Sequence, residues 1–117
     1  MTKVVRVVTE DGRVVCERCL VAGSFLARSR GLLGRRELPP GEGLLLRPAG
    51  SIHMFFMRFA IDAVFLDRDL RVVGVAANLR PWRMAGRRRA KATLELAAGE
   101  AARAGVTAGD VLLLADP

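Results

Sequence analysis

The stretch from His53 to Asp67 constrains the fold more than any other part of the chain. It is the most apolar run in the sequence, and it holds the only histidine and four of the five phenylalanines. If the run is extended, its side chains alternate between two faces, and both faces are largely apolar. No polar stripe recurs at helical spacing, so a helix is disfavoured. The run therefore predicts strands that are covered on both sides, as in a small sandwich or barrel.

The length and composition bound the class of protein. At 117 residues, the chain is predicted to form a single domain, 1–117, that can bury a core without disulfides or metal. Hydrophobic residues make up 51% of the chain, which argues against disorder. No apolar stretch reaches the roughly 18 residues of a membrane span. The N-terminus shows no apolar segment with a cleavage site, so we expect a cytoplasmic protein with no membrane partner.

The spacing of apolar and turn residues predicts the other elements. Two short helices are expected, one from Ser24 to Leu33 and one over 99–105. The segment 84–89 is expected to be exposed and mobile. The remaining expected strands are 3–8, 14–20, 44–46, 71–77, 91–96 and 111–114. The predicted fold class is mainly β (α+β): a compact β-sandwich or barrel-like domain with two short helices.

Two carboxylates and the single histidine are the polar residues of most interest. A bare carboxylate is costly to bury, so Asp62 should be hydrogen-bonded or paired, with Arg58 and other arginines as partners. Such carboxylates occur in structural ion pairs as well as in functional sites. Glu95 falls in an alternating strand pattern and is expected to face solvent unless an arginine meets it. His53 titrates near neutral pH, so both a structural and a functional role remain open.

The chain is basic, with a net charge of +7. Most of the 19 basic residues are arginines, and a chain rich in Arg, Ala and Gly fits a GC-rich genome. The densest cluster falls within 80–89, where an anion-binding patch is predicted. Nucleic acid is one candidate partner there. However, stacking aromatic residues are scarce outside the expected core, with only Trp82 nearby. The nucleic-acid candidates are Arg83, Arg87, Arg88 and Arg89.

The two cysteines, Cys16 and Cys19, form a single C-x-x-C in an expected strand. One such pair is at best half of a zinc site. On a regular strand, residues three apart point to opposite faces, so the two sulfurs could not meet on one metal. We therefore expect two ordinary reduced cysteines, no metal site and no cofactor. The sequence also lacks a serine elbow and a phosphate-binding loop, so no known catalytic motif marks it as an enzyme.

Three pieces occur in order along the chain: Arg30–Arg35 (RGLLGR), His53–Asp67, and Leu94–Gly99 followed by Gly105–Asp110. Together they resemble the family known as domain of unknown function 192, a group of small uncharacterised prokaryotic proteins. The resemblance covers roughly residues 14 to 114 and implies a β-rich sandwich or barrel with short helices. It implies no reaction. The recurrent polar positions that it implies here are Arg30, Arg35, Met57, Asp62 and Glu95.

Four functions remain open from the sequence. The one we favour is a small-ligand-binding domain, because arginines and carboxylates from distant segments could line one cleft and bind an anionic or polyhydroxylated molecule. An enzyme using an Asp62–Glu95 pair with His53 as base is the second. Weak nucleic-acid binding and a purely structural or interaction role are the others. The candidate ligand-binding residues are Arg30, Arg35, His53, Met57, Arg58, Asp62 and Glu95.

Overall fold

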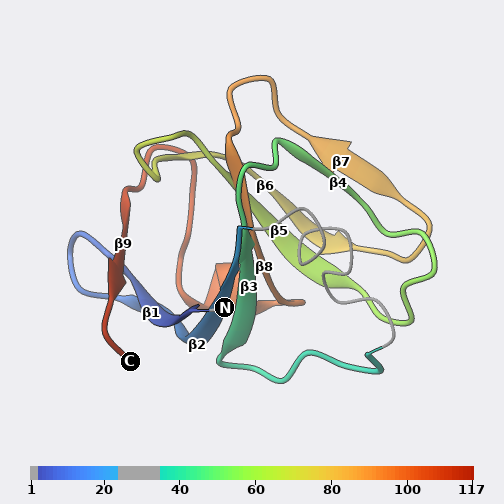
Figure 1. The fold of residues 1–117 in the computed structure, drawn as a ribbon, viewed down its shortest axis with the longest axis horizontal. Helices are drawn as coiled ribbons and strands as arrows, with labels where there is room; N and C mark the ends of the chain where they lie inside the picture. The colour runs from blue at the N-terminus through green and yellow to red at the C-terminus, as the bar shows by residue number, and fades with distance from the viewer. Residues whose placement is uncertain (1–2, 24–34) are drawn as a thin grey trace.

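A seven-stranded sheet, a two-stranded sheet and one short helix make up the described part of the chain, residues 3–23 and 35–117 of the computed structural model (Figure 1). The prediction of a mainly β fold is confirmed. The second predicted helix is also confirmed, as α2, whereas the helix predicted from Ser24 lies outside the described residues. The elements are β1 (Lys3–Thr9), β2 (Val14–Ala22), β3 (Glu42–Leu46), β4 (Ser51–His53), β5 (Ile61–Leu66), β6 (Val72–Leu79), β7 (Met84–Gly86), β8 (Ala92–Ala97), α2 (Glu100–Arg103) and β9 (Leu112–Ala115).

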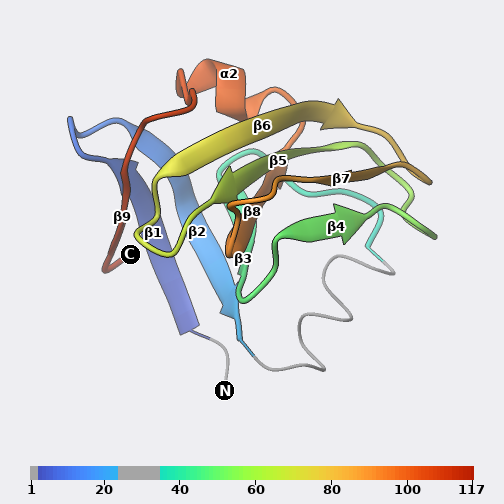
Figure 2. The same ribbon diagram turned by 90° about the horizontal axis from the view of Figure 1, so that it is seen from above.

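The large sheet has the order β6-β5-β8-β3-β2-β1-β9 and curls until its two edges approach (Figure 2). An isolated bridge between Arg71 and Val111 joins these edges, and the Leu112 N–H donates to the Leu70 carbonyl at 2.9 Å. Only β2 and β3 pair in parallel; every other neighbouring pair is antiparallel. The result is a partly closed barrel. Of the two architectures predicted from the sequence, a sandwich and a barrel, the structure is the second.

Both faces of the central strands are buried, which explains the continuous apolar character of their sequences. All six residues of β5 and all six of β8 are buried. One face, with Val64 and Leu94, packs in a first core inside the curl of the sheet. The other face, with Phe65 and Ile61, packs in a second core against the residues around the small β4–β7 sheet. The prediction that the central run is covered on both sides is therefore confirmed for its second half, β5.

The central run is not extended throughout, and here the sequence prediction was wrong. β4 ends at His53, and residues 54–60 turn before β5 begins at Ile61. Phe56 sits in the left-handed region at φ 66°. The segment expected to be exposed and mobile, 84–89, contains β7, which pairs with β4 in antiparallel register. Alternation alone could not reveal this break, because the turn residues are as apolar as the strands beside them.

The two cysteines lie on the same face of β2, contrary to the prediction. Cys16 pairs with Val7 and Cys19 with Val5, so three steps along β2 match two steps along β1. The extra residue is a β-bulge, which restores both side chains to the first core. A hydrogen bond between the two thiols lowers the pKa of Cys16 and raises the pKa of Cys19. Both cysteines are free, which agrees with the prediction of reduced thiols, and both are buried.

Candidate functional site

Two loops at one end of the small sheet are tied together through their backbones. The first, 54–60, follows β4, and the second, 80–83, precedes β7. The Met54 N–H donates to the Arg83 carbonyl at 2.7 Å, and the Trp82 N–H donates to the Met54 carbonyl at 2.7 Å. The Met54 side chain is buried in the second core. One residue therefore anchors both loops to the sheet beneath them, at the right-hand side of Figure 1.

Four aromatic side chains from these loops and from β4 form a continuous stack, which we call the aromatic ledge: His53, Phe55, Phe56 and Trp82. The His53 and Phe55 ring centroids are 4.7 Å apart, and those of Phe55 and Trp82 are 5.9 Å apart. Phe56 tilts against Trp82 at 4.9 Å. Phe56 is 71% exposed and Trp82 is 59% exposed. Rings of this size normally bury much of their surface, so their exposure marks the ledge as a contact surface.

The backbone that presents the ledge is strained. Phe56 has φ 66° and Trp82 has φ 69°, a region that large side chains rarely occupy. Each such residue costs roughly 1–3 kcal/mol, and such strain clusters at ligand-binding sites. Below them, Met54 and Met57 are buried in the second core. The loop thus directs its methionines inward and holds Phe56 outward at a conformational cost that packing alone does not explain.

Three arginines flank the ledge: Arg58, Arg80 and Arg83. All three are exposed. Within residues 3–23 and 35–117, none of them forms an ion pair. The sequence segments 51–60 and 79–86 contain no aspartate or glutamate. The segments that build the ledge therefore contribute positive charge and no carboxylate of their own.

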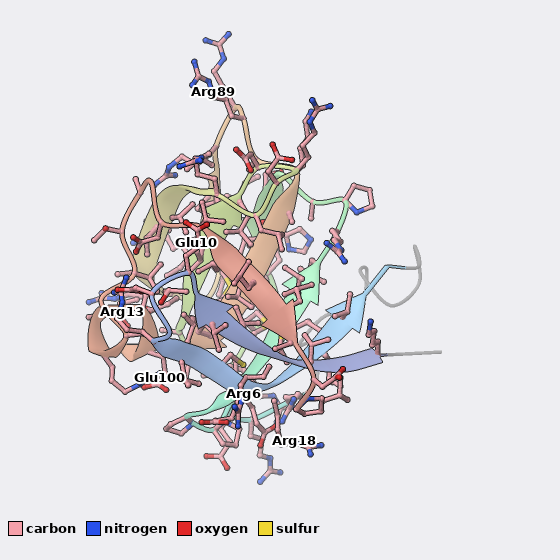
Figure 3. The ribbon with its side chains drawn as sticks, turned by 90° about the vertical axis from the view of Figure 1, so that its left-hand side faces the viewer. Arg6, Glu10, Arg13, Arg18, Arg89 and Glu100 are labelled. Atoms are coloured by element: carbon pink, nitrogen blue, oxygen red, sulfur yellow. The ribbon has the colours of Figure 1, made fainter. Side chains whose placement is uncertain are left out.

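The other nucleic-acid candidates divide into one structural arginine and two exposed ones. Arg87 donates to the carbonyl of Gly86 at 2.8 Å and to that of Val75 at 3.4 Å. Its guanidinium lies 5.2 Å from the centre of the Phe65 ring, and it crosses Gly74, where a Cβ would collide with it. Arg87 therefore covers the core. Arg88 and Arg89 are exposed, and Figure 3 shows Arg89 pointing away from the body of the protein.

Asp62 is buried and fully engaged with backbone donors. One carboxylate oxygen accepts the Asn78 N–H at 2.9 Å. The other accepts the N–H groups of Gly99 at 3.0 Å and Ala101 at 2.9 Å, at the start of α2. The prediction of a hydrogen-bonded carboxylate is confirmed. The prediction of an arginine partner is wrong, because three amide groups satisfy the carboxylate before any guanidinium is needed.

Glu95 is also buried, at 6% exposure, which contradicts the expectation that it faces solvent. Within the described part of the chain, no hydrogen bond or ion pair reaches its carboxyl group. Burial therefore raises its pKa to about 7. Glu95 lies directly opposite Ala63, whereas Asp62 lies directly opposite Leu96. Since directly opposed residues share a face, the two carboxyl groups point to opposite sides of the sheet and form no catalytic pair.

The other predicted site residues are dispersed. Arg35 pairs with Glu42 at 3.6 Å, and Met57 is buried in the second core. Arg30 lies outside the described residues. Of the predicted set, His53 belongs to the ledge and Arg58 lies in the loop that carries it, while Asp62 and Glu95 face the two separate cores.

Sequence reasoning missed the ledge because it assigned the phenylalanines to the core. Phe55 is half-buried and Phe56 is exposed. A signal was present: Met54 and Met57 already supply the buried contacts of this loop, so the two phenylalanines between them are not needed there. Trp82, directly after Pro81, was the second signal, because a proline bend holds its neighbour at the surface.

The described residues also set limits on other chemistry. Nowhere in them do three His, Cys, Asp or Glu side chains gather as metal ligands would. No helix in the described ranges has the length and hydropathy to cross a membrane. The cytoplasmic location and the lack of a cofactor stay predictions.

Comparison with known families gives a clear match. The model of the family DUF192, described as "Uncharacterized ACR", matches residues 6–114. This chain belongs to that family. The resemblance found in the three sequence pieces is thereby confirmed over almost the whole chain. The family description states no activity, so the function has to be argued from the site.

Relatives and solved structures agree with this assignment. A UPF0127 protein of Pyrococcus horikoshii is 40% identical over 70 residues, covering 55% of this chain and 57% of that protein. One of Thermococcus sibiricus is 39% identical over 80 residues, covering 62% and 49%. The match thus spans about half of these relatives.

Two crystal structures are similar over nearly the whole chain. A protein of unknown function from Novosphingobium aromaticivorans has a TM-score of 0.81 at 28% identity, covering 96% of this chain and 84% of that one. A putative transcription regulator from Sinorhizobium meliloti has a TM-score of 0.83 at 27% identity, covering 97% and 94%. The fold of this chain therefore recurs in both of these proteins.

Proposed function

We propose that this chain is a binding domain for a small anionic ligand that carries a flat ring, with nucleotides as the ligand class. The aromatic ledge is the observation that carries this proposal. Exposed, mutually stacked rings offer a flat face, and base–aromatic stacking is worth about 1–3 kcal/mol per base. Arg58, Arg80 and Arg83, which form no ion pair among the described residues, supply charge-assisted hydrogen bonds to phosphate.

The same surroundings argue against a neutral, polyhydroxylated ligand. Hydroxyl groups accept hydrogen bonds as well as donate them, and sites that bind several hydroxyl groups commonly provide ionised carboxylates to accept the donated hydrogens. The loops that form the ledge contain none, and the nearest carboxylate in sequence, Asp62, already accepts three backbone hydrogen bonds. The sequence predicted either an anionic or a polyhydroxylated ligand, and the residues of the ledge favour an anionic one.

A second candidate is a short single-stranded nucleic acid, which offers the same bases and phosphates in a polymer. The objection that stacking residues are scarce no longer holds, because Phe55 and Phe56 join Trp82 at the ledge. Arg88 and Arg89 follow β7 at the end away from the ledge and could contact further phosphates. The similar Sinorhizobium meliloti protein is described as a putative transcription regulator, which also favours this candidate.

Intrinsic fluorescence provides a direct test, because Trp82 is the only tryptophan and the chain has no tyrosine. Titration with adenosine monophosphate at fixed ionic strength should quench Trp82 emission to saturation. Adenosine, which lacks the phosphate, should bind more weakly. A hexamer of deoxythymidine that binds much more tightly than thymidine monophosphate would favour the polymer. Absence of saturable quenching by both nucleotide and hexamer would refute the proposal.

Matched variants distinguish binding at the ledge from non-specific hydrophobic binding elsewhere on the surface. Phe56→Ala should weaken adenosine monophosphate binding by about tenfold, since one stacking contact is lost. Leu113→Ala removes an exposed apolar side chain from β9, away from the ledge, and should leave binding unchanged. Arg58→Ala with Arg83→Ala should weaken the nucleotide but not adenosine. Equal loss in the Leu113 variant would mean that the ledge is not the site.

A further inference from the structure

Two strands of the large sheet end, and the strand between them begins, at a site that no sequence motif marked. In the sheet, β8 lies between β5 and β3. The last residue of β5, Leu66, pairs with the first residue of β8, Ala92. The last residue of β3, Leu46, pairs with Thr93 of β8. The residues that follow β5 and β3, and the residue that precedes β8, therefore emerge side by side at one end of the sheet.

These residues line a pocket of about 290 Å³, which we call the strand-end pocket. Backbone hydrogen bonds hold its walls: the Lys91 N–H donates to the Leu66 carbonyl at 2.7 Å, and the Ala49 N–H donates to the Lys91 carbonyl at 2.9 Å. Lys91 is thus tied to both neighbouring segments. The lining residues are Arg47, Pro48, Asp67, Arg68, Leu70, Lys91 and Ala92.

The polar lining is strongly positive. Arg47, Arg68 and Lys91 are all exposed, and none of them forms an ion pair in the described ranges 3–23 and 35–117. The single carboxylate, Asp67, is committed to its own turn, where one oxygen accepts the N–H groups of Asp69 and Arg71 at 2.9 Å each. Three cationic side chains and one anionic side chain leave a formal surplus of two positive charges.

The turn beneath the pocket is strained in the same way as the ledge. Leu70 has φ 65°, which is unusual for a branched side chain. Its N–H donates to the Asp67 carbonyl at 3.0 Å, which closes the turn. Leu70 is a half-buried residue that packs against the first core and also lines the pocket. Non-glycine residues in this region cluster at sites that bind ligands.

We propose that the strand-end pocket binds a small phosphate-bearing molecule, independently of the aromatic ledge. A phosphate monoester carries close to two negative charges at pH 7 and three terminal oxygens, which match the surplus charge and the three cationic groups. A carboxylate has one charge and two oxygens, and one arginine is enough to bind it. The pocket volume is at the lower limit of ligand sites, so the carbon part of the molecule is small and rests on Pro48, Leu70 and Ala92.

Inorganic phosphate and pyrophosphate are suitable probes. Amide chemical shifts of ¹⁵N-labelled protein, recorded during titration at constant ionic strength, should move for Arg68, Lys91 and Ala92 and saturate. The double variant Arg68→Ala and Lys91→Ala should raise the dissociation constant for pyrophosphate at least tenfold, in line with the loss of charge-assisted hydrogen bonds. Both side chains are exposed, so the variant should fold, which far-UV circular dichroism will check.

The matched control removes the same charge elsewhere. Arg18 and Arg36 are exposed and form no ion pair in the described part of the chain. In the β2–β3 ladder, the backbone of Arg18 lies opposite that of Glu42, the first residue of β3. This is the end of β3 that lies far from the pocket. Arg18→Ala with Arg36→Ala should leave the dissociation constant within twofold. Equal weakening in both double variants, or acetate binding as tightly as phosphate, would overturn the proposal, while the fluorescence test of the ledge would be unaffected.

Discussion

Two buried carboxylates occupy neighbouring strands of one sheet and face opposite cores, and their surroundings differ completely. Asp62 on β5 accepts three backbone hydrogen bonds. Glu95 on β8 has no hydrogen-bond partner within the described residues, and burial raises its pKa to about 7. Sequence context alone does not separate the two, because both lie between apolar residues. What separates them is the donors on the face toward which each points.

The difference has an energetic meaning. A buried carboxylate that accepts several amide hydrogen bonds is stabilised as the anion. Its removal also leaves those amides unsatisfied, so Asp62 joins β5, β6 and the start of α2. A buried carboxylate without donors is tolerated only when it is protonated. Asp62 is therefore a structural centre of the fold, and Glu95 is a carboxyl group whose charge the fold opposes.

The largest expected effect is at Asp62. Asp62→Ala should lower the free energy of unfolding by about 3–5 kcal/mol. The buried Ala101 amide loses its acceptor at roughly 1–3 kcal/mol, and the part-buried amides of Asn78 and Gly99 each lose a hydrogen bond worth about 1 kcal/mol. Urea denaturation followed by circular dichroism measures this value. Asp62→Asn retains one acceptor oxygen and should be intermediate. A loss below about 1 kcal/mol for the alanine variant would show that these amides find other acceptors.

The next effect is a pH dependence that arises from Glu95. Its pKa is raised from 4.5 in the ordinary state to about 7 in the fold. Between these values the folded protein binds one more proton than the unfolded chain, so stability falls as pH rises. The 2.5-unit difference corresponds to about 3 kcal/mol lost between pH 4.5 and pH 8.

The variant Glu95→Gln isolates this contribution, because it cannot ionise. Urea midpoints measured from pH 5 to pH 8.5 should decline less steeply in the variant than in the native chain. At pH 8 the variant should be the more stable of the two, whereas Asp62→Asn should be less stable than the native chain at the same pH. If the pH profiles of stability for the native chain and Glu95→Gln are parallel, ionisation of Glu95 does not destabilise the fold, and the proposed difference between the two carboxylates is wrong.

The smallest effect would come from giving Glu95 a donor. Ala63 lies directly opposite Glu95 on the neighbouring strand, where the Cβ atoms of paired residues are about 5 Å apart. Ala63→Ser should let a hydroxyl donate to the carboxylate, lower its pKa and make the pH profile of stability shallower by about 1 kcal/mol. Ala92→Ser is the control, because Ala92 lies in the first core on the opposite face. The same pH series measures both variants.

The fold class and most strands could be predicted, because short alternating apolar segments bounded by turn residues are local signals. The family resemblance was also visible in the sequence. The break after His53 could not be predicted, because its turn is made of phenylalanines and methionines that suit a strand equally well. The candidate site depended on that break: the ledge exists because residues 54–60 leave the sheet.

The sequence also could not predict which groups the polar residues contact. Asp62 was expected to need an arginine, but the three groups that bind it are main-chain amides, which every residue type carries and no composition reveals. The strand-end pocket was invisible for a related reason. Its cations follow or precede three strands that are distant in the chain, and only the sheet order brings Arg47, Arg68 and Lys91 together.

Because the bulge in β2 places Cys16 and Cys19 in the same core, alkylation of these two thiols can report local unfolding of the sheet around β2. Cys16 and Cys19 are 1% and 0% exposed, so an alkylating reagent can reach either sulfur only after the surrounding strands separate. When opening and closing are fast relative to alkylation, the labelling rate tracks the population of the open form. Because the bulge places both sulfurs in the same core, they should become modified together, and a persistent singly labelled species would reveal that one half of β2 detaches before the other.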